Sequence, residues 1–177
     1  MAQPRILIAC IGNIFLGDDA FGVEVAKRLA ARKLPDEVRL KDFGIRGFDL
    51  AYALLDEYEV TILVDATPRG GAPGTLYLIE PDLSELEVNN AQTAALDTHG
   101  MNPMKVLQMA RSMGAQFQQI LLVGCEPMTF GSEEQGQMGL SEPVAAAVDE
   151  ALRMIESLIA KMLATDLRQQ AIPSTAT

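Results

Sequence analysis

The sequence predicts an α/β protein with three layers, α/β/α, built on a twisted, mainly parallel sheet of five strands. Five short apolar runs alternate with longer amphipathic stretches, which is the order of a parallel sheet covered by helices on both faces. The chain has 177 residues, of which 49% are hydrophobic and 21% charged, as expected for one globular domain. We therefore expect a single domain over residues 1–168 and a flexible tail over residues 169–177.

Each expected element follows from a local pattern. Branched and aliphatic runs bounded by turn residues predict strands over residues 5–11, 37–43, 59–65, 74–80 and 118–124. Apolar residues at helical spacing predict helices over residues 20–33, 47–57, 101–113 and from residue 141 onward. Ser141 and Pro143 are typical of the first turn of the last helix. Residues 81–96 are polar and weakly patterned, so we expect a long loop, a kind of segment that is often functional.

Charge and composition exclude several classes of protein. The net charge of −10 and the pI of about 4.5 exclude a general nucleic-acid binder, which needs a basic face. No run approaches the roughly 18 apolar residues of a membrane span, and no signal peptide is recognisable. The two cysteines, Cys10 and Cys125, suggest buried thiols rather than a disulfide framework. We expect a cytoplasmic protein with no nucleic-acid or membrane partner, and a monomer, because no strong apolar stripe stands out.

The first candidate site segment covers residues 12–22 and reads GNIFLGDDAFG. It joins an expected strand to an expected helix, but it lacks the G-x-G-x-x-G phosphate fingerprint. Two adjacent carboxylates would also repel a phosphate. One aspartate is enough to cap the helix, so we assign Asp18 to the cap and Asp19 to a functional role. The alternative is a turn in which an aspartate only caps the helix.

Asp65 and His99 are the next candidates. Asp65 ends an apolar strand, and a buried charge is costly unless it is paired, hydrogen-bonded or bound to a metal. His99 is the only histidine of the chain, and imidazole with carboxylates is a common ligand set for borderline divalent metals. Such a set leaves positions open for water or substrate. Alternatively, Asp65 accepts backbone N–H bonds in the next turn and His99 is structural or exposed; spacing alone does not decide.

Asp42 also follows an expected strand, in the segment DFGIRG, and it either lies beside the site or holds a turn. Nucleophilic catalysis is disfavoured, because the sequence has no G-x-S-x-G motif. The cysteines also precede no histidine partner. These observations argue against a serine or cysteine nucleophile.

These segments together resemble the hydrogenase maturation endopeptidases, which process the large subunit of [NiFe] hydrogenases. The resemblance spans residues 5–160 and rests on the glycines and acids of residues 12–22 and on D-x-G-x-x-G over residues 42–47. It includes VDA over residues 64–66, APGT over residues 72–75, His99 ahead of its helix, and the LLVG strand over residues 121–124. The resemblance implies a compact α/β/α fold.

The resemblance also implies an activity and a site. Members of this family remove a short C-terminal extension from the large-subunit precursor after nickel has been inserted. Their metal-contacting triad corresponds to Asp19, Asp65 and His99, and the implied metal is nickel supplied by the precursor. Asp42 is a weaker catalytic candidate, for orienting a water or the substrate backbone. The resemblance thus implies a metal-dependent or aspartyl-type endopeptidase whose partner is the large-subunit precursor.

Two departures from the family pattern concern the partner and the metal. The acid of the first motif is often Glu, whereas Asp19 is one methylene shorter. The second motif often reads D-G-G-T-x-G, and Phe43 and Ile45 do not match it. Two other classes of function remain open: a nickel checkpoint or chaperone that binds the precursor without cutting it, and an α/β hydrolase or nucleotide-binding domain that acts on a small molecule.

Overall fold

The structure, a computed structural model, describes residues 5–87, 101–132 and 134–170. Its strands are β1 (Ile6–Ile11), β2 (Val38–Gly44), β3 (Val60–Ala66), β4 (Leu76–Ile79) and β5 (Gln119–Cys125). Its helices are α1 (Phe21–Ala30), α2 (Gly47–Ala53), α3 (Pro103–Ser112) and α4 (Glu142–Gln170), with 3₁₀ turns η1 (Gly17–Ala20) and η2 (Leu83–Glu87). The five-stranded α/β fold expected from the sequence is confirmed.

The strand order of the sheet is β2-β1-β3-β5-β4. All neighbouring pairs are parallel except β4 with β5, which are antiparallel. The chain leaves β1 to form β2 on one side and then returns to form β3 on the other side of β1. The strand order therefore reverses between β1 and β3, and ligands of open α/β sheets bind at the carboxyl ends of the strands at such a point.

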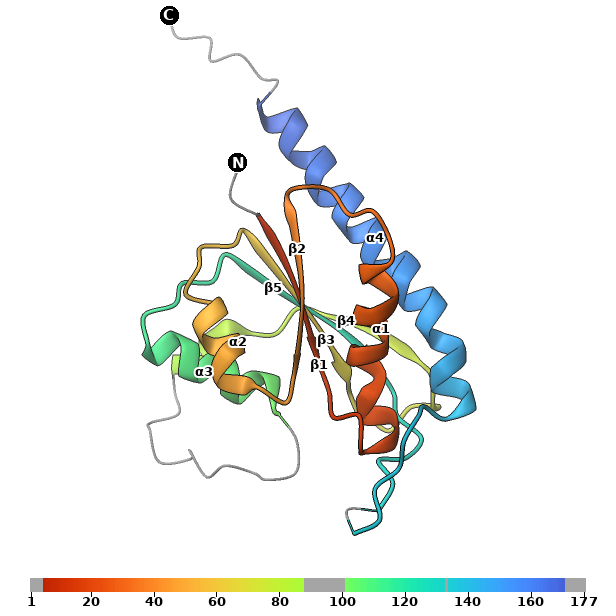
Figure 1. The fold of residues 1–177 in the computed structure, drawn as a ribbon. Helices are drawn as coiled ribbons and strands as arrows, with labels where there is room; N and C mark the ends of the chain where they lie inside the picture. Colours follow the sequence, from red (N-terminus) through yellow and green to blue (C-terminus); the bar gives the residue numbers. More distant parts are fainter. Residues whose placement is uncertain (1–4, 88–100, 133, 171–177) are drawn as a thin grey trace, which may run out of the picture.

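Helices cover both faces of the sheet, with α1 and α4 on one face and α2 and α3 on the other (Figure 1). Alternate residues of β1 supply the two cores: Ile8 packs toward α1 and α4, and Leu7 packs into the core with α2 and α3. Every residue of β1 and β3 is buried. Continuous burial is typical of central parallel strands and explains their unbroken apolar runs.

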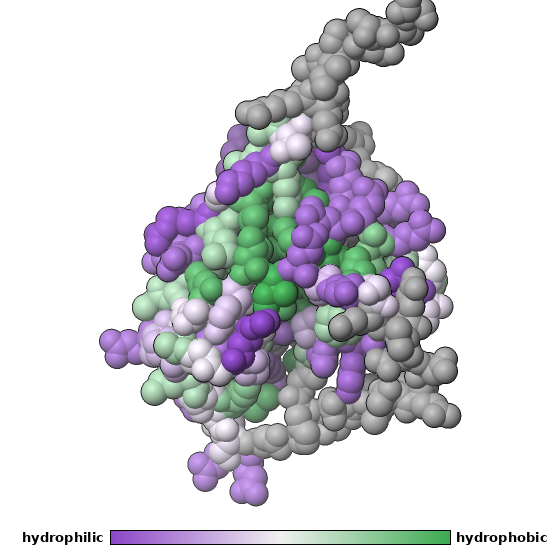
Figure 2. All heavy atoms as spheres, turned by 180° about the vertical axis from the view of Figure 1, so that it is seen from behind, coloured by the Kyte–Doolittle hydropathy of each residue, from purple (hydrophilic) through white to green (hydrophobic). Residues whose placement is uncertain are grey.

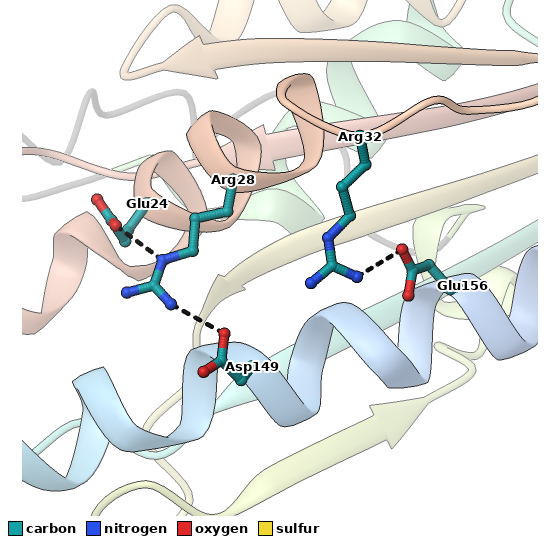
Figure 3. A network of polar contacts seen from close by, with 5 residues as sticks. All are labelled: Glu24, Arg28, Arg32, Asp149 and Glu156. Atoms are coloured by element: carbon teal, nitrogen blue, oxygen red, sulfur yellow. Dashed lines mark hydrogen bonds and ion pairs between the residues drawn. The ribbon is translucent and has the colours of Figure 1, made fainter.

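Ion pairs join α1 to α4 along their exposed sides (Figure 3). Arg28 lies 3.1 Å from Glu24 and 2.9 Å from Asp149, and Arg32 lies 2.6 Å from Glu156. These side chains are 31% to 63% exposed, so each pair contributes at most about 1 kcal/mol. The buried apolar residues between the two helices therefore supply most of the packing energy.

Several boundaries differ from the sequence-based expectation. A 3₁₀ turn, η1, occupies the residues before α1, which begins at Phe21. The expected loop over residues 81–96 contains η2, in which Leu86 is buried in the core beside α2 and α3; residues 88–96 lie outside the described residues. Helix α4 continues to Gln170, two residues into the expected tail, and residues 171–177 also lie outside the described part.

The short strand β4 forms one edge of the sheet, and this edge faces the viewer in Figure 2. An apolar strip runs along the centre of that view, bordered by hydrophilic side chains. Leu78 of β4 is 49% exposed. The strand has only four residues, and a short edge offers few free backbone groups for pairing with another chain.

Among the described helices, none has the length and hydropathy needed to cross a bilayer.

Gly22 allows α1 to lie directly on the carboxyl ends of β1 and β3. A Cβ at this position would lie 2.1 Å from the Ile11 carbonyl oxygen and 2.5 Å from that of Val64. We expect Gly22→Ala to lower the free energy of unfolding by about 3 kcal/mol, because backbone atoms of two central strands would have to move. Urea unfolding followed by circular dichroism measures this loss.

Gly47→Ala is the matched control for Gly22→Ala. Gly47 begins α2, and a Cβ there would meet its nearest atom, Cγ2 of Val106, at 3.4 Å. Alanine favours helix over glycine by about 1 kcal/mol, so the control should be neutral or slightly stabilising. Equal losses in the two variants would contradict the assigned close contact.

Candidate active site

Two acidic side chains follow the central strands at the point where the strand order reverses. Asp19 lies in η1, which follows β1 after a connection over residues 12–16, and Asp65 is the penultimate residue of β3. Gly12 brings η1 onto the end of β1, because a Cβ at that position would lie 2.1 Å from the Asp19 carbonyl oxygen. Glycines 12 and 22 of the first motif thus allow close backbone contacts that hold Asp19 over the β1–β3 edge.

Asp65 is a buried carboxyl group with an unpaired oxygen. The residue is 6% exposed, and its Oδ1 atom has no hydrogen-bond partner in the described part of the chain. Burial raises the pKa of Asp65 well above its ordinary value, the negative charge of Asp19 raises it further, and the Ala66 N–H opposes these effects. An unpaired buried oxygen is costly, so this carboxyl group favours a bound proton or cation.

Asp19 is half-buried, and its Oδ2 atom accepts a hydrogen bond of 3.0 Å from the Asn13 backbone N–H. Burial raises the pKa of Asp19, and the Asn13 hydrogen bond partly opposes that rise. The turn η1, which carries Asp19, contacts β3, which carries Asp65, and the charge of Asp19 raises the pKa of Asp65, so these two predicted residues lie near one another. Two neighbouring carboxylates that are partly shielded from water repel each other, and a shared proton or a divalent cation relieves this repulsion.

Nickel, the metal that the resemblance implies, would need oxygen and nitrogen donors from these residues. Asp19 and Asp65 supply carboxylate oxygens, and the unpaired Asp65 Oδ1 atom is a free donor among the described residues. No group of three or more potential ligands occurs within residues 5–87, 101–132 and 134–170. His99, the expected third ligand, lies outside the described residues. The two described carboxylates fit a divalent cation but form an incomplete set without another donor.

Asp42 lies near the end of β2, and its side chain projects from the face of the sheet opposite to that of Asp65. Its exposed carboxylate accepts a 2.8 Å hydrogen bond from the Gly44 N–H, as in a turn. The next residue, Phe43, is buried in the core with α2 and α3, so Asp42 projects toward the α1 face. Asp65 alternates with Val64, which faces α1 and α4, and so projects toward the α2 and α3 face. The structure does not bring Asp42 and Asp65 together.

Asp18 is not a helix cap, and this expectation was wrong. Neither η1 nor α1 has a side-chain hydrogen bond at its described N-terminus. Asp18 is instead fully buried, and its carboxylate accepts hydrogen bonds from Met128, Thr129 and Ser141. These residues lie in the segment between β5 and α4. The local pattern of the first motif carried no information about partners so distant in sequence.

Glu126 is a buried carboxylate that the sequence analysis did not identify, and it also lies at the carboxyl ends of the parallel strands. It follows β5 and accepts hydrogen bonds from the N–H groups of Arg69 (2.8 Å) and Gly70 (3.1 Å) and from the Tyr77 hydroxyl (2.7 Å). Burial alone would raise the pKa of Glu126, but these hydrogen bonds outweigh it and lower the pKa. Glu126 therefore fixes the turn between β3 and β4 as an ionised, satisfied group.

Exposed apolar side chains lie on two adjoining segments, one of which leads into η1 and Asp19. The β1–η1 connection lies against the β5–α4 segment through a bridge between Leu16 and Gln137. Both segments lie at the lower edge of the sheet in Figure 1. Their exposed large apolar residues, here called the apolar edge patch, are Ile14, Phe15, Met128, Phe130 and Met138. Single exposed apolar residues are ordinary, but a group of them beside a site indicates an interaction surface.

Comparisons with known proteins identify related sequences and structures. The sequence model of the hydrogenase maturation protease family matches residues 23–158. The chain is 35% identical over 165 residues to the hydrogenase expression/formation protein HoxM of Azotobacter vinelandii, covering 91% of this chain and 75% of that protein.

Two solved structures are also similar. The hydrogenase maturating endopeptidase HybD from E. coli is 27% identical with a TM-score of 0.70, covering 89% of this chain and 93% of its own. The [NiFe] hydrogenase maturation protease HycI from Thermococcus kodakarensis KOD1 is 27% identical with a TM-score of 0.58, covering 90% and 92%. The family match extends over most of the chain and includes β3 with Asp65, and it begins after η1. The chain therefore belongs to the hydrogenase maturation protease family.

Proposed function

We propose that this protein is the endopeptidase that removes the C-terminal extension of a [NiFe] hydrogenase large-subunit precursor after nickel insertion. The observation that carries the proposal is the buried, unpaired Oδ1 atom of Asp65 beside the Asp19 carboxylate, at the edge where the strand order reverses. The name of the Thermococcus relative, a [NiFe] hydrogenase maturation protease, supports the class of substrate.

The nickel of the precursor is proposed as the recognition element. Asp19 and Asp65 would offer oxygen ligands and His99 a nitrogen ligand to nickel that the precursor already holds. The raised pKa values of the two carboxyl groups disfavour two free negative charges in the unbound protein, and a divalent cation relieves that repulsion. A precursor without nickel would therefore form no stable complex with this protein. Nickel near the scissile bond would polarise the carbonyl or a water.

The apolar edge patch supports a protein as the partner. Buried apolar side chains at the centre of an interface commonly supply most of its affinity. The Phe15 and Met138 side chains are 60% and 68% exposed, and Gln137 beside Met138 donates its N–H to the Phe15 carbonyl at 2.8 Å. The patch is thus held in place by backbone bonds before any partner arrives. The net charge of −10 would assist the approach of a basic precursor tail.

We expect Phe15→Ser with Met138→Ser to raise KM for the precursor about tenfold and to leave kcat unchanged, because the patch binds substrate and transition state alike. Steady-state cleavage kinetics give the two constants. Leu78→Ser, at the β4 edge and 49% exposed, is the matched control and should change neither constant. A similar rise in KM for the control would refute the proposed location of the interface.

The function is tested by mixing the protein with its cognate large-subunit precursor, with and without nickel, and weighing the products by mass spectrometry. Loss of a C-terminal peptide from the nickel-loaded precursor alone is the expected result. Binding without a change in mass would favour the non-cleaving checkpoint. Neither binding nor cleavage of a confirmed partner would overturn the proposal.

We also propose that residues 1–168 act as one peptidase domain and that the protein is a cytoplasmic monomer. The two apolar cores share the central sheet, which supports one folding unit over the described residues. Sedimentation at micromolar concentration tests the oligomeric state, and a dimer that buries the apolar edge patch would contradict this proposal.

A further inference from the structure

Asp18, next to the candidate ligand Asp19, is the centre of a hydrogen-bond network that the proposed chemistry does not use. Its Oδ2 atom accepts from the Met128 N–H at 2.8 Å, the Thr129 N–H at 3.1 Å and the Ser141 hydroxyl at 2.9 Å. Its Oδ1 atom accepts from the Ser141 N–H at 2.7 Å. All four partners donate, so the site requires an acceptor-only group, and an ionised carboxylate is the side chain that meets this requirement.

Backbone contacts extend the same attachment on either side of Asp18. The Asp18 N–H donates to the Thr129 carbonyl at 3.0 Å, and the Gly17 N–H donates to the Gln137 carbonyl at 2.8 Å. A Cβ at Gly17 would lie 2.9 Å from the Thr129 carbonyl oxygen. The Asp18 side chain, the backbone N–H groups of Gly17 and Asp18, and the close packing at Gly17 thus all bind η1 to the β5–α4 segment.

We propose that Asp18 is a positioning residue that sets the Asp19 carboxylate relative to Asp65 by fastening η1 to the β5–α4 segment. Asp19 is the next residue, and its own N–H donates to the Leu16 carbonyl at 3.1 Å within the fastened turn. A rotation of η1 would therefore displace the Asp19 carboxylate. The catalytic consequence rests on the proposed function, whereas the geometric consequence does not.

The Asn13 amide reports on the position of Asp19. It donates to the Asp19 Oδ2 atom at 3.0 Å and is not among the described partners of the Asp18 carboxylate. A change at the Asn13 amide after substitution of Asp18 would therefore have to pass through η1. This distinguishes a positioning role from a merely structural one, which would disturb only the amides bound directly to Asp18.

The test is Asp18→Asn, which keeps the shape of the side chain but turns an N–H₂ group toward backbone donors. Amide hydrogen exchange by NMR follows Asn13, Met128, Thr129 and Ser141, and precursor cleavage is measured in parallel. We expect exchange at Asn13 to become about tenfold faster than in a control of equal thermal stability, with kcat lowered about tenfold or more. Ile159→Ala, in the core between the sheet and α4, is that control.

Unchanged exchange at Asn13, with faster exchange at Met128, Thr129 and Ser141 only, would overturn the proposal. If Asp18→Asn does not fold, Ser141→Ala removes the hydroxyl donor alone and leaves three backbone donors in place. We then expect Asn13 exchange about twofold to fivefold faster, and no change would overturn the proposal. If the unmodified protein cleaves nothing, the proposed function fails while the Asn13 measurement still decides the role of Asp18.

Discussion

Asp65→Asn is expected to lower the rate of precursor cleavage by about a thousandfold and to stabilise the fold. The loss follows from removing a charged group aimed at the reacting centre, an effect that typically reaches about 10²–10³. The gain follows because the buried Asp65 Oδ1 atom has no partner among the described residues, so at neutral pH the native state bears the cost either of a buried charge or of binding a proton. We expect a gain of about 1 kcal/mol, the size common for relief of an active-site charge.

The sign of the pH dependence follows from the raised pKa of Asp65. The unfolded chain loses the proton of this residue near pH 4, and the folded chain holds it to a higher pH. Between these two pKa values the folded state binds more protons, so the free energy of unfolding falls as pH rises. The stability gain of Asp65→Asn should therefore be smallest below about pH 4 and grow until the pH passes the raised pKa of Asp65.

Glu126→Gln is the matched control, because Glu126 is also a buried carboxylate, 5% exposed against 6% for Asp65. Its hydrogen bonds from Arg69, Gly70 and Tyr77 lower its pKa despite burial. A group with a lowered pKa stabilises the fold above its unfolded pKa and loses that contribution as pH falls. Glu126→Gln should thus lower the free energy of unfolding at neutral pH. Urea unfolding over a pH series measures both variants, and changes of the same sign would refute this account.

Strand-end reasoning could predict the edge of the sheet at which the acids lie, but not the face. Asp42 and Asp65 both come near the ends of parallel strands, as expected. The face depends on the alternation of side chains and on register. Asp42 and Val64 both pair with Cys10, which faces α1 and α4, whereas Asp65 is one residue further along β3. Asp42 therefore projects toward α1, while Asp65 projects toward the face covered by α2 and α3.

Long-range partners were the part of the site that the sequence could not predict. The pattern at Ser141 correctly predicted the start of α4, yet the Ser141 hydroxyl bonds to Asp18, 123 residues earlier. The apolar edge patch is likewise assembled from two segments far apart in sequence, so no periodic apolar pattern in the sequence predicts it. Local patterns report which residues are inside or capped, whereas the partner of a buried carboxylate is fixed by tertiary structure.

His99→Ala is expected to abolish nickel-dependent cleavage, with a loss of about a thousandfold in kcat/KM. The reason is the chemistry of the donor set: two carboxylates alone suit hard cations such as magnesium, and an imidazole nitrogen shifts the preference toward nickel. The free energy of unfolding, measured in parallel, separates loss of a ligand from loss of the fold. Cleavage of the nickel-loaded precursor, followed by mass spectrometry, gives the rate.

Added imidazole makes this prediction specific to a nitrogen ligand. If His99 supplies nickel with a nitrogen ligand, free imidazole at millimolar concentration should restore part of the cleavage by His99→Ala. The same addition should not restore Asp65→Asn, because that variant lacks an oxygen ligand and its site differs in charge. A His99→Ala variant that is folded and fully active would remove His99 from the site, and Asp19 and Asp65 would then need a different third donor to discriminate nickel from harder cations.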